Sequence, residues 1–293
     1  MKYIIDTDPG IDDALAIMMG YLNHLDIIGF TLATGNIEKE KSKNNLKVIQ
    51  KVLNSNIKMY EGSSTNKANS YAAFAHGNDG LGNTFFPVIS DMPMEKMNAE
   101  DFIISKAEEL GNDLTIICLG PLTNLANALK KRPYIASKIA EVVIMGTSYD
   151  PYATSKYEEF NIRVDPVSAN IVFSSPFKKI KCVTHEIGVK SFIKIDDIEK
   201  LTTTNKTISK FAYMIAQKYI EFTKEHNHII GLSTPDPTTM AAVIDESIVT
   251  FKPCKISVNG NYTDIILTEN SNIYVSTDFN IEKFRNLFMK TFM

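Results

Sequence analysis

Short runs of apolar residues alternate along this chain with segments whose apolar residues recur at helical spacing. Residues 3–6 and 27–34 are typical of buried strands, because their side chains are mainly apolar. Residues 12–23 lie between them and place Leu15 and Leu22 on one face of a helix. Buried strands joined by helices fold as a mostly parallel sheet that helices cover on both faces.

The same alternation continues to the end of the chain, without repeats or linkers, and predicts one α/β domain over residues 1–293. Residues 254–276 read as a hairpin-rich segment in which Asn259-Gly260 is a turn signal. The remaining predicted strands are residues 58–61, 114–119, 141–145 and 179–184, and the remaining predicted helices are residues 39–54, 99–110, 122–131, 166–173, 208–223, 236–244 and 281–289.

Two long stretches, residues 62–98 and 147–161, carry no regular pattern. Loops of this length inside a compact domain are usually functional. In open α/β sheets the ligand site lies beyond the carboxyl ends of the strands, so chemistry is expected at that edge.

Composition excludes several other classes of protein. The 293 residues contain 31 basic and 34 acidic side chains, with a net charge of −3 and an apolar fraction of 44%. These values are ordinary for a globular chain and argue against disorder, collagen and coiled coil as the main state. A chain without a basic surplus is a poor partner for nucleic acid. No run of about 18 apolar residues is present, so no membrane span is expected.

The three cysteines, Cys118, Cys182 and Cys254, each lie in an apolar or β-branched run. They are predicted to be buried, reduced thiols in strands, which fits a reducing compartment. The first residues contain no apolar stretch of signal-peptide length. A cytoplasmic protein is therefore expected.

Four aspartates fall within eight positions at the end of the first predicted strand: Asp6, Asp8, Asp12 and Asp13. Like charges this close are unfavourable unless a cation or a set of hydrogen bonds compensates them. Oxygen ligands without a nearby His or Cys favour a hard cation, Ca²⁺ or Mg²⁺. A helix N-cap is the plainer interpretation, but capping needs only one or two of the four acids. An EF-hand is excluded because Ile17 stands where its loop needs glutamate.

The string Asp6-x-Asp8-Pro9-Gly10-x-Asp12-Asp13 resembles the signature of the nucleoside hydrolase family, the inosine–uridine-preferring N-ribohydrolases. The resemblance extends in order from residue 3 to about residue 245. The other segments that carry it are Thr34-Gly35-Asn36, His76-Gly77-Asn78-Asp79-Gly80-Leu81-Gly82, Leu119-Gly120-Pro121-Leu122-Thr123-Asn124, Met145-Gly146, Glu159-Phe160-Asn161, Asp165-Pro166 and Asp236-Pro237.

The resemblance implies an enzyme that hydrolyses the N-glycosidic bond of a small-molecule nucleoside in nucleoside salvage, as a homodimer or homotetramer. It also implies a Ca²⁺ site formed by carboxylates of Asp8, Asp13 and Asp236 and the backbone carbonyl of Thr123. Ribose hydroxyls and a water would complete the ligand shell, and Asp8 would activate that water.

The resemblance further implies a set of substrate-binding and catalytic residues. Asp12, Asn36 and Asn161 would hold ribose hydroxyls, Glu159 would reach the 5′-hydroxyl, and Asp236 and Met145 would line the site. His76 is a further candidate catalytic residue. Without the family, four of these positions have plainer interpretations: a turn residue for Asn36, a solvated loop for Glu159, a helix cap for Thr123 and core packing for Met145.

The chain departs from the family at Pro235, where family members that prefer inosine and uridine carry the histidine that protonates the departing base. His226 and His228 precede it by about ten residues, in a region that is a mobile loop in the family. One hypothesis is that either histidine is the substitute acid, and the alternative is that both are solvated loop residues. His24 and His185 are predicted to be structural.

Two further departures are Thr147, where a second glycine is frequent, and Ala153, where an asparagine normally contacts the 5′-hydroxyl. Recognition of the 5′ end is then weaker, or it passes to a tyrosine such as Tyr157.

Two rival functions remain open. Pro235 and Ala153 favour a nucleoside or ribose binder without turnover. An Asp-based Mg²⁺ phosphohydrolase would use Asp6-x-Asp8, but that class usually needs Asp-x-Asp-x-Thr or Asp-x-Asp-x-Ser, and here Pro9-Gly10 follows the second aspartate.

Overall fold

A nine-stranded sheet forms the centre of the computed structural model, which describes residues 1–63 and 71–293. Its strand order is β10-β9-β11-β6-β5-β4-β1-β2-β3, and every neighbouring pair from β11 to β3 is parallel. The strands are β1 (Lys2–Thr7), β2 (Ile27–Leu32), β3 (Met59–Glu61), β4 (Leu114–Cys118), β5 (Glu141–Met145), β6 (Ile180–Val183), β9 (Val249–Asn259), β10 (Tyr262–Leu267) and β11 (Ile273–Phe279), with β7 (Phe192–Lys194) and β8 (Gly231–Ser233) in a separate antiparallel pair.

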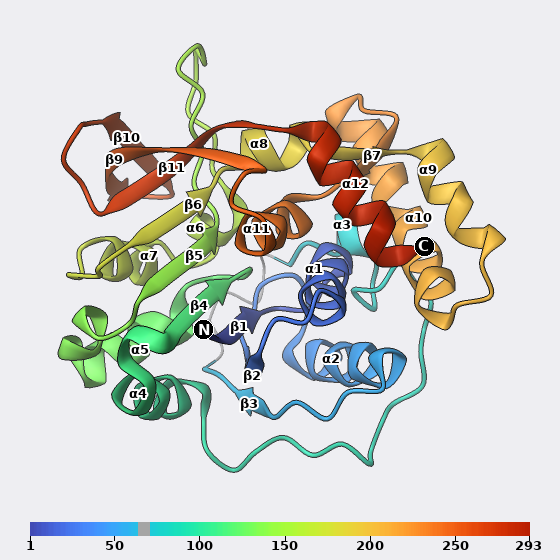
Figure 1. Cartoon of the computed structure of the whole chain (residues 1–293), viewed down its shortest axis with the longest axis horizontal. Helices are drawn as coiled ribbons and strands as arrows, with labels where there is room; N and C mark the ends of the chain where they lie inside the picture. The colour runs from blue at the N-terminus through green and yellow to red at the C-terminus, as the bar shows by residue number, and fades with distance from the viewer. Residues whose placement is uncertain (64–70) are drawn as a thin grey trace.

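Helices cover both faces of this sheet, as predicted. Figure 1 shows α1, α2 and α12 on one side of the central strands and α4, α5 and α7 on the other. The helices are α1 (Ile11–Leu22), α2 (Lys39–Leu53), α3 (Ala73–His76), α4 (Ala99–Leu110), α5 (Thr123–Lys131), α6 (Phe160–Val164), α7 (Pro166–Phe173), α8 (His185–Lys190), α9 (Ile195–Lys200), α10 (Thr207–Asn227), α11 (Pro235–Ile244) and α12 (Ile281–Phe292).

Two hydrophobic cores lie on the two faces because side chains alternate along each strand. Ile5 of β1 and Ile117 of β4 belong to the core beneath α1, α11 and α12. Ile4 and Ile116 point the other way, into the core with α4, α5 and α7. Strands that are buried on both faces have no polar side to expose, which explains the near-continuous apolar runs in the sequence.

The C-terminal part of the sheet contains the predicted hairpin. β9 and β10 pair antiparallel through a turn at Gly260, whose φ of +62° favours glycine. β9 begins five residues before the predicted start at 254, because Val249 and Thr250 pair with Phe279 and Asp278 of β11. β11 then returns parallel to β6.

Several short elements were not predicted: α3, α6, α8, β7, α9 and β8. None of these helices exceeds six residues and the two strands have three each, too short for a hydrophobic period to show. The prediction for residues 62–98 also covers residues 64–70, which lie outside the described residues. Helix α10 continues beyond the predicted residue 223, so the expectation of a loop at His226 was wrong.

Cys118, Cys182 and Cys254 are buried free thiols, as predicted. In the described residues, no helix has the length and apolar character that a membrane span requires.

Helix α12 packs on α1, α10 and α11 and carries three phenylalanines spaced four residues apart, Phe284, Phe288 and Phe292, all fully buried. The ring of Phe288 lies 4.6 Å from that of Phe292. We predict that Phe288→Ala lowers the free energy of unfolding by about 3–5 kcal/mol, because the cavity it leaves cannot collapse. Urea denaturation measures this loss. Asn286→Ala, on the exposed face of the same helix, should change stability by less than about 0.5 kcal/mol. Similar losses in both variants would contradict the assignment.

Candidate active site

The acidic segment lies where β1 ends and α1 begins, between the carboxyl ends of β2 and β4. The chain order of the strands reverses here, since β2 and β3 continue to one side of β1 and β4 to β6 to the other. Such a switch point opens a crevice in which open α/β sheets bind ligands. The sequence-based expectation about the location of the site is therefore met.

The carboxylate of Asp13 organises this segment. Its Oδ1 accepts hydrogen bonds from Thr7 Oγ1 at 2.5 Å and the Asp8 amide at 3.2 Å. Its Oδ2 accepts from the Gly10 amide at 3.0 Å and Asn36 Nδ2 at 2.9 Å. Both oxygens of a fully buried carboxylate are thus compensated by donors from the turn that they close.

Asp8 is fully buried and closely surrounded by backbone. Its Oδ2 accepts from the Asn36 amide at 2.7 Å, whereas its Oδ1 has no hydrogen-bond partner among the described residues. A Cβ at Gly35 or Gly120 would clash with this carboxylate, so only glycine fits at both positions. Burial, followed by the charge of Asp13, raises the pKa of Asp8 well above its usual range.

Asp12, Asp13 and Asp236 form an acidic group that could hold a metal ion. One oxygen from each lies within 4.8 Å of the others, and all three residues are buried. Burial raises the pKa of each, to about 6 for Asp12, and the neighbouring acids raise those of Asp13 and Asp236 further. Oxygens at this spacing fit around a single Ca²⁺, whose ligands lie at about 2.3–2.6 Å.

This group differs in part from the predicted metal ligands. Asp12 joins it, and Asp8 contributes the unpaired oxygen beside it. Thr123 opens α5 and its hydroxyl donates to Asp165 Oδ2 at 2.7 Å, so its side chain does not cap its own helix. Its proposed carbonyl ligand stays a prediction.

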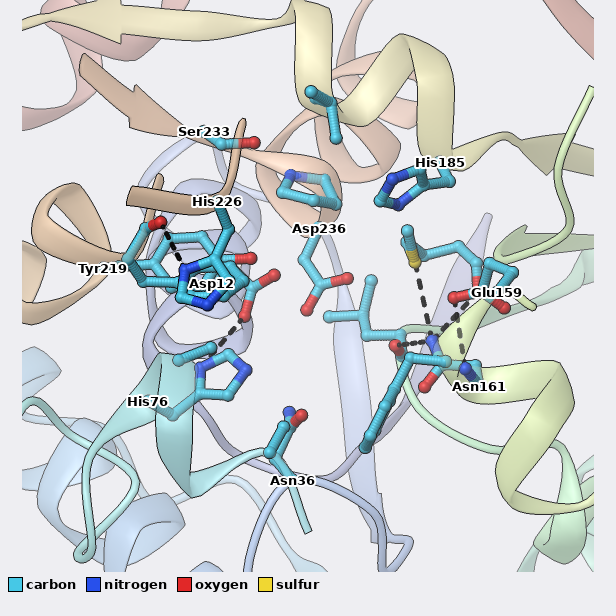
Figure 2. Close-up of a pocket in the computed structure, with 18 of the residues that line it drawn as sticks. Asp12, Asn36, His76, Glu159, Asn161, His185, Tyr219, His226, Ser233 and Asp236 are labelled. Atoms are coloured by element: carbon cyan, nitrogen blue, oxygen red, sulfur yellow. Dashed lines mark hydrogen bonds and ion pairs between the residues drawn. The ribbon is translucent and has the colours of Figure 1, made fainter. Parts of the chain in front are cut away.

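A cavity of about 390 Å³ is lined by Asp12 and Asp236 of this group, whereas Asp8 and Asp13 are not among its lining residues (Figure 2). It contains every predicted substrate-binding residue. Of the candidate catalytic histidines, His76 and His226 line it and His228 does not. The predicted substrate-binding residues in its wall are Asp12, Asn36, Met145, Glu159, Asn161 and Asp236.

Glu159 and Asn161 form one wall of the cavity at the start of α6. The Glu159 carboxylate caps this helix by accepting from the amides of Asn161 and Ile162, at 3.1 and 3.0 Å. Asn161 Nδ2 donates to the backbone carbonyl of Leu119 at 2.8 Å. Glu159 is only 3% exposed, and burial raises its pKa to about 7, so the solvated-loop interpretation of this residue was wrong.

His76 and Tyr219 form the opposite wall, at the side of Asp12 in Figure 2. Their rings stack with centroids 5.2 Å apart. Nδ1 of His76 accepts a hydrogen bond from the Ile11 amide at 3.1 Å, which leaves the ring proton on Nε2. Burial lowers the pKa of His76 to about 4, so the ring is neutral at physiological pH.

The loop that follows His76 is attached directly to the acidic turn. Asn45 of α2 donates from Nδ2 to the carbonyls of Pro9 and Asp79, at 3.1 and 2.8 Å. Gly80, with φ of +80°, leaves room for this side chain. No sequence signal identified Asn45, because it lies inside an ordinary amphipathic helix.

Helix α10 continues the aromatic wall toward the rim. Tyr219, Phe222 and His226 follow one another, with centroid separations of 5.6 and 4.6 Å. His226 is exposed and its Nδ1 lies 3.2 Å from the carbonyl of Phe222. His228 ends the helix in a left-handed conformation.

His185 was predicted to be structural, but its side chain lines the cavity. It opens α8 directly after β6, and its ring stacks on Tyr157 with centroids 4.1 Å apart. The position at a carboxyl end of a parallel strand was the available signal.

Known proteins that are similar to this chain are nucleoside hydrolases and nucleosidases. A model of the inosine-uridine preferring nucleoside hydrolases matches residues 3–286. Uridine nucleosidase 1 of Arabidopsis thaliana is 33% identical over 257 residues, which cover 86% of this chain and 76% of that protein.

Solved structures give the same result. A purine-preferring ribonucleoside hydrolase from Gardnerella vaginalis superposes with a TM-score of 0.91 at 28% identity, covering 100% of this chain and 98% of that one. A plant nucleoside hydrolase has a TM-score of 0.89 at 29% identity, covering 99% and 98%.

The fold and the site together define a hydrolase of N-glycosyl compounds. The chain belongs to the inosine-uridine preferring nucleoside hydrolase family, whose model spans nearly its whole length.

The glycines around Asp8 give a direct test of this site. In Gly35→Ala the new methyl group displaces the Asp8 carboxylate, and we predict an activity loss of about 100-fold, as expected when a reacting group moves by about 1 Å. Initial rates of ribonucleoside hydrolysis measure it. The control is Gly111→Ala at the opposite end of β4, where a Cβ meets nothing within 4 Å. The φ of +54° at this position costs the alanine variant about 1–3 kcal/mol of stability and leaves the rate unchanged. Equal rates in both variants would disprove the role of Gly35.

Proposed function

We propose that this enzyme hydrolyses ribonucleosides to free base and ribose with Ca²⁺ as its cofactor, in nucleoside salvage. The observation that carries the proposal is the buried group of Asp12, Asp13 and Asp236, of which Asp12 and Asp236 line the cavity, together with the unpaired Oδ1 of Asp8. Carboxylates concentrated in this way favour a cation and a substrate that develops positive charge.

Ca²⁺ fits the donors because they are all oxygens and because this ion accepts up to about eight ligands, sugar hydroxyls among them. When bound, the ion supplies positive charge that anchors the ribose hydroxyls and makes a water more acidic. Asp8, Asp13, Asp236 and the carbonyl of Thr123 are the proposed protein ligands, and the geometry adds Asp12 as a neighbour.

Asp8 is the proposed general base. Its Oδ1 accepts a proton from the water that attacks C1′, while the C1′–N bond breaks and its electron pair leaves with the base. The sugar passes through an oxocarbenium-like state, whose positive charge the surrounding buried carboxylates stabilise.

Ribose is held between the two walls in this proposal. Asp12 and Asn36 bind hydroxyls on one side and Asn161 on the other, with Glu159 at the 5′-hydroxyl. The side-chain Nδ2 of Asn36 already donates to Asp13. The Oδ1 of Asn36 is therefore the atom that accepts a hydrogen bond from a sugar hydroxyl. His76, with its proton on Nε2, faces the cavity as a neutral donor.

His226 and His228 were the proposed substitutes for the acid that Pro235 lacks. His226 lines the cavity and keeps this role as a hypothesis, whereas His228 lies outside the lining residues. Pro235 itself lines the cavity and has no proton to give, which keeps a binder without turnover as the second candidate function.

The three buried thiols and the absence of a membrane-spanning helix in the described residues are compatible with the proposed cytoplasmic location. Assembly as a homodimer or homotetramer is proposed from the family resemblance alone.

Removal of the general base is the first test. We predict that Asp8→Asn lowers kcat on p-nitrophenyl riboside by about 10²–10⁴-fold, because the amide cannot accept the proton of water. Asp113→Asn, an exposed substitution before β4, is the matched control and should retain the wild-type rate. Undiminished turnover by Asp8→Asn would show that another group is the base. Binding of p-nitrophenyl riboside by the wild type without hydrolysis would favour the binder.

Removal of the metal is the second test. Dialysis against EGTA should abolish hydrolysis, and Ca²⁺ should restore it better than Mg²⁺, which prefers a smaller octahedral site. Because Ca²⁺ should bind the native state and not the unfolded chain, it should also stabilise the protein by about 2.7 kcal/mol at a concentration 100-fold above its Kd. Thermal denaturation with and without Ca²⁺ measures this, and Asp13→Asn should lose most of the effect. A stability and activity independent of Ca²⁺ would reject the ion.

A further inference from the structure

Pro235 leaves the wall beside Asp236 without a side chain that can donate a hydrogen bond. Its ring carries neither a titratable group nor a backbone N–H. A base that departs from C1′ takes an electron pair with it, and its negative charge needs a donor nearby. If the enzyme stabilises the departing base, another side chain close to this wall must donate a hydrogen bond to it.

Helix α8 packs directly against Pro235. A Cβ at Gly188 would lie 2.8 Å from the Cβ of Pro235 and 2.9 Å from its Cα, so the two backbones are in close contact. Val189, next in the helix, lines the cavity together with Pro235. The start of α11 and the inner face of α8 thus form one continuous wall.

His185 stands on this wall, one turn before Gly188 and Val189. Figure 2 shows its ring directed toward the cavity, on the side of Asp236 that faces away from His76 and His226. The His185 side chain therefore lines the same part of the cavity as Pro235, where a histidine at position 235 would face the departing base.

The ring of His185 is held in place by the segment that follows β5. Its backbone N–H donates to the carbonyl of Thr147 at 3.1 Å, and its ring stacks on Tyr157 at an interplanar angle of 19°. The adjacent carboxylate of Glu186 accepts from the Tyr149 amide at 2.8 Å and from the Ser148 hydroxyl. These contacts orient the ring without using its nitrogens.

Both ring nitrogens of His185 remain available to a ligand. Within residues 1–63 and 71–293, neither has a hydrogen-bond partner, whereas Nδ1 of His76 binds the Ile11 amide and Nδ1 of His226 lies against the carbonyl of Phe222. Burial lowers the pKa of His185, and the charge of Glu186 opposes this shift. The neutral ring retains one N–H to donate.

We propose that His185 donates a hydrogen bond to the departing base and so replaces, from α8, the donor that position 235 lacks. This inference rests on the proposed hydrolysis of ribonucleosides. The donor stabilises the charge that develops on the base as the C1′–N bond breaks, so its contribution depends on how poor the leaving group is.

The test compares leaving groups. His185→Ala should lower kcat/KM for uridine and inosine by about 100-fold or more, as expected for the loss of one donor to a developing anion. The loss with p-nitrophenyl riboside, whose phenolate leaves without help, should be much smaller. His185→Gln, which keeps an N–H near the position of Nε2, should recover part of the nucleoside activity. His24→Asn, at an exposed helix end, is the control for loss of a histidine and should match the wild type on all three substrates.

Equal losses on nucleosides and p-nitrophenyl riboside would show a merely structural role and overturn the inference. A selective nucleoside loss in His226→Ala with none in His185→Ala would overturn it in favour of His226. If His185→Ala fails to fold, as judged by circular dichroism, His185→Gln is compared on the same substrates. A larger loss on nucleosides than on p-nitrophenyl riboside supports the inference, and equal losses overturn it. A wild-type protein inactive on p-nitrophenyl riboside would instead reject the proposed function itself.

Discussion

The burial of the Asp13 carboxylate is the constraint on which the rest of the site depends. An uncompensated oxygen on a desolvated carboxylate costs free energy, and four donors from Thr7, Asp8, Gly10 and Asn36 compensate both oxygens of Asp13. Those bonds close the turn between β1 and α1 and bring Asn36, at the end of β2, beside it. Without them, the neighbouring aspartates would repel one another into solvent, and no oxygen cluster would form at the carboxyl edge of the sheet.

The sequence predicted the sheet, its long helices and the location of the site, because strands buried on both faces leave an unmistakable apolar pattern. It also predicted that Asp12, Asn36, Glu159, Asn161 and Asp236 converge, although this rested on family resemblance and not on spacing. Single residues brought together across about 200 positions leave no periodic signal. Asn45 and His185 show the same limit, since each lies in a segment whose local pattern describes only a helix.

The two walls of the cavity are built from different chemistry. One wall is an aromatic series on α10 that stacks on His76. The other is polar and depends on backbone geometry. Thr147, a β-branched residue with φ of +74°, directs its N–H toward Glu159 at 3.4 Å and its carbonyl toward the N–H of His185. Such a conformation costs about 1–3 kcal/mol and persists only where surrounding contacts impose it.

The close approach of Gly188 to Pro235 also limits which residue can stand at position 188. Any Cβ at position 188 would lie less than 3.0 Å from the Cα and Cβ of Pro235, so α8 can stay where it is only with glycine at this position. Position 235, by contrast, is the first residue of α11, where a proline is tolerated because its missing N–H would have no partner within the helix. The glycine at position 188 therefore sets how closely α8, and with it His185, can approach the residue that precedes Asp236.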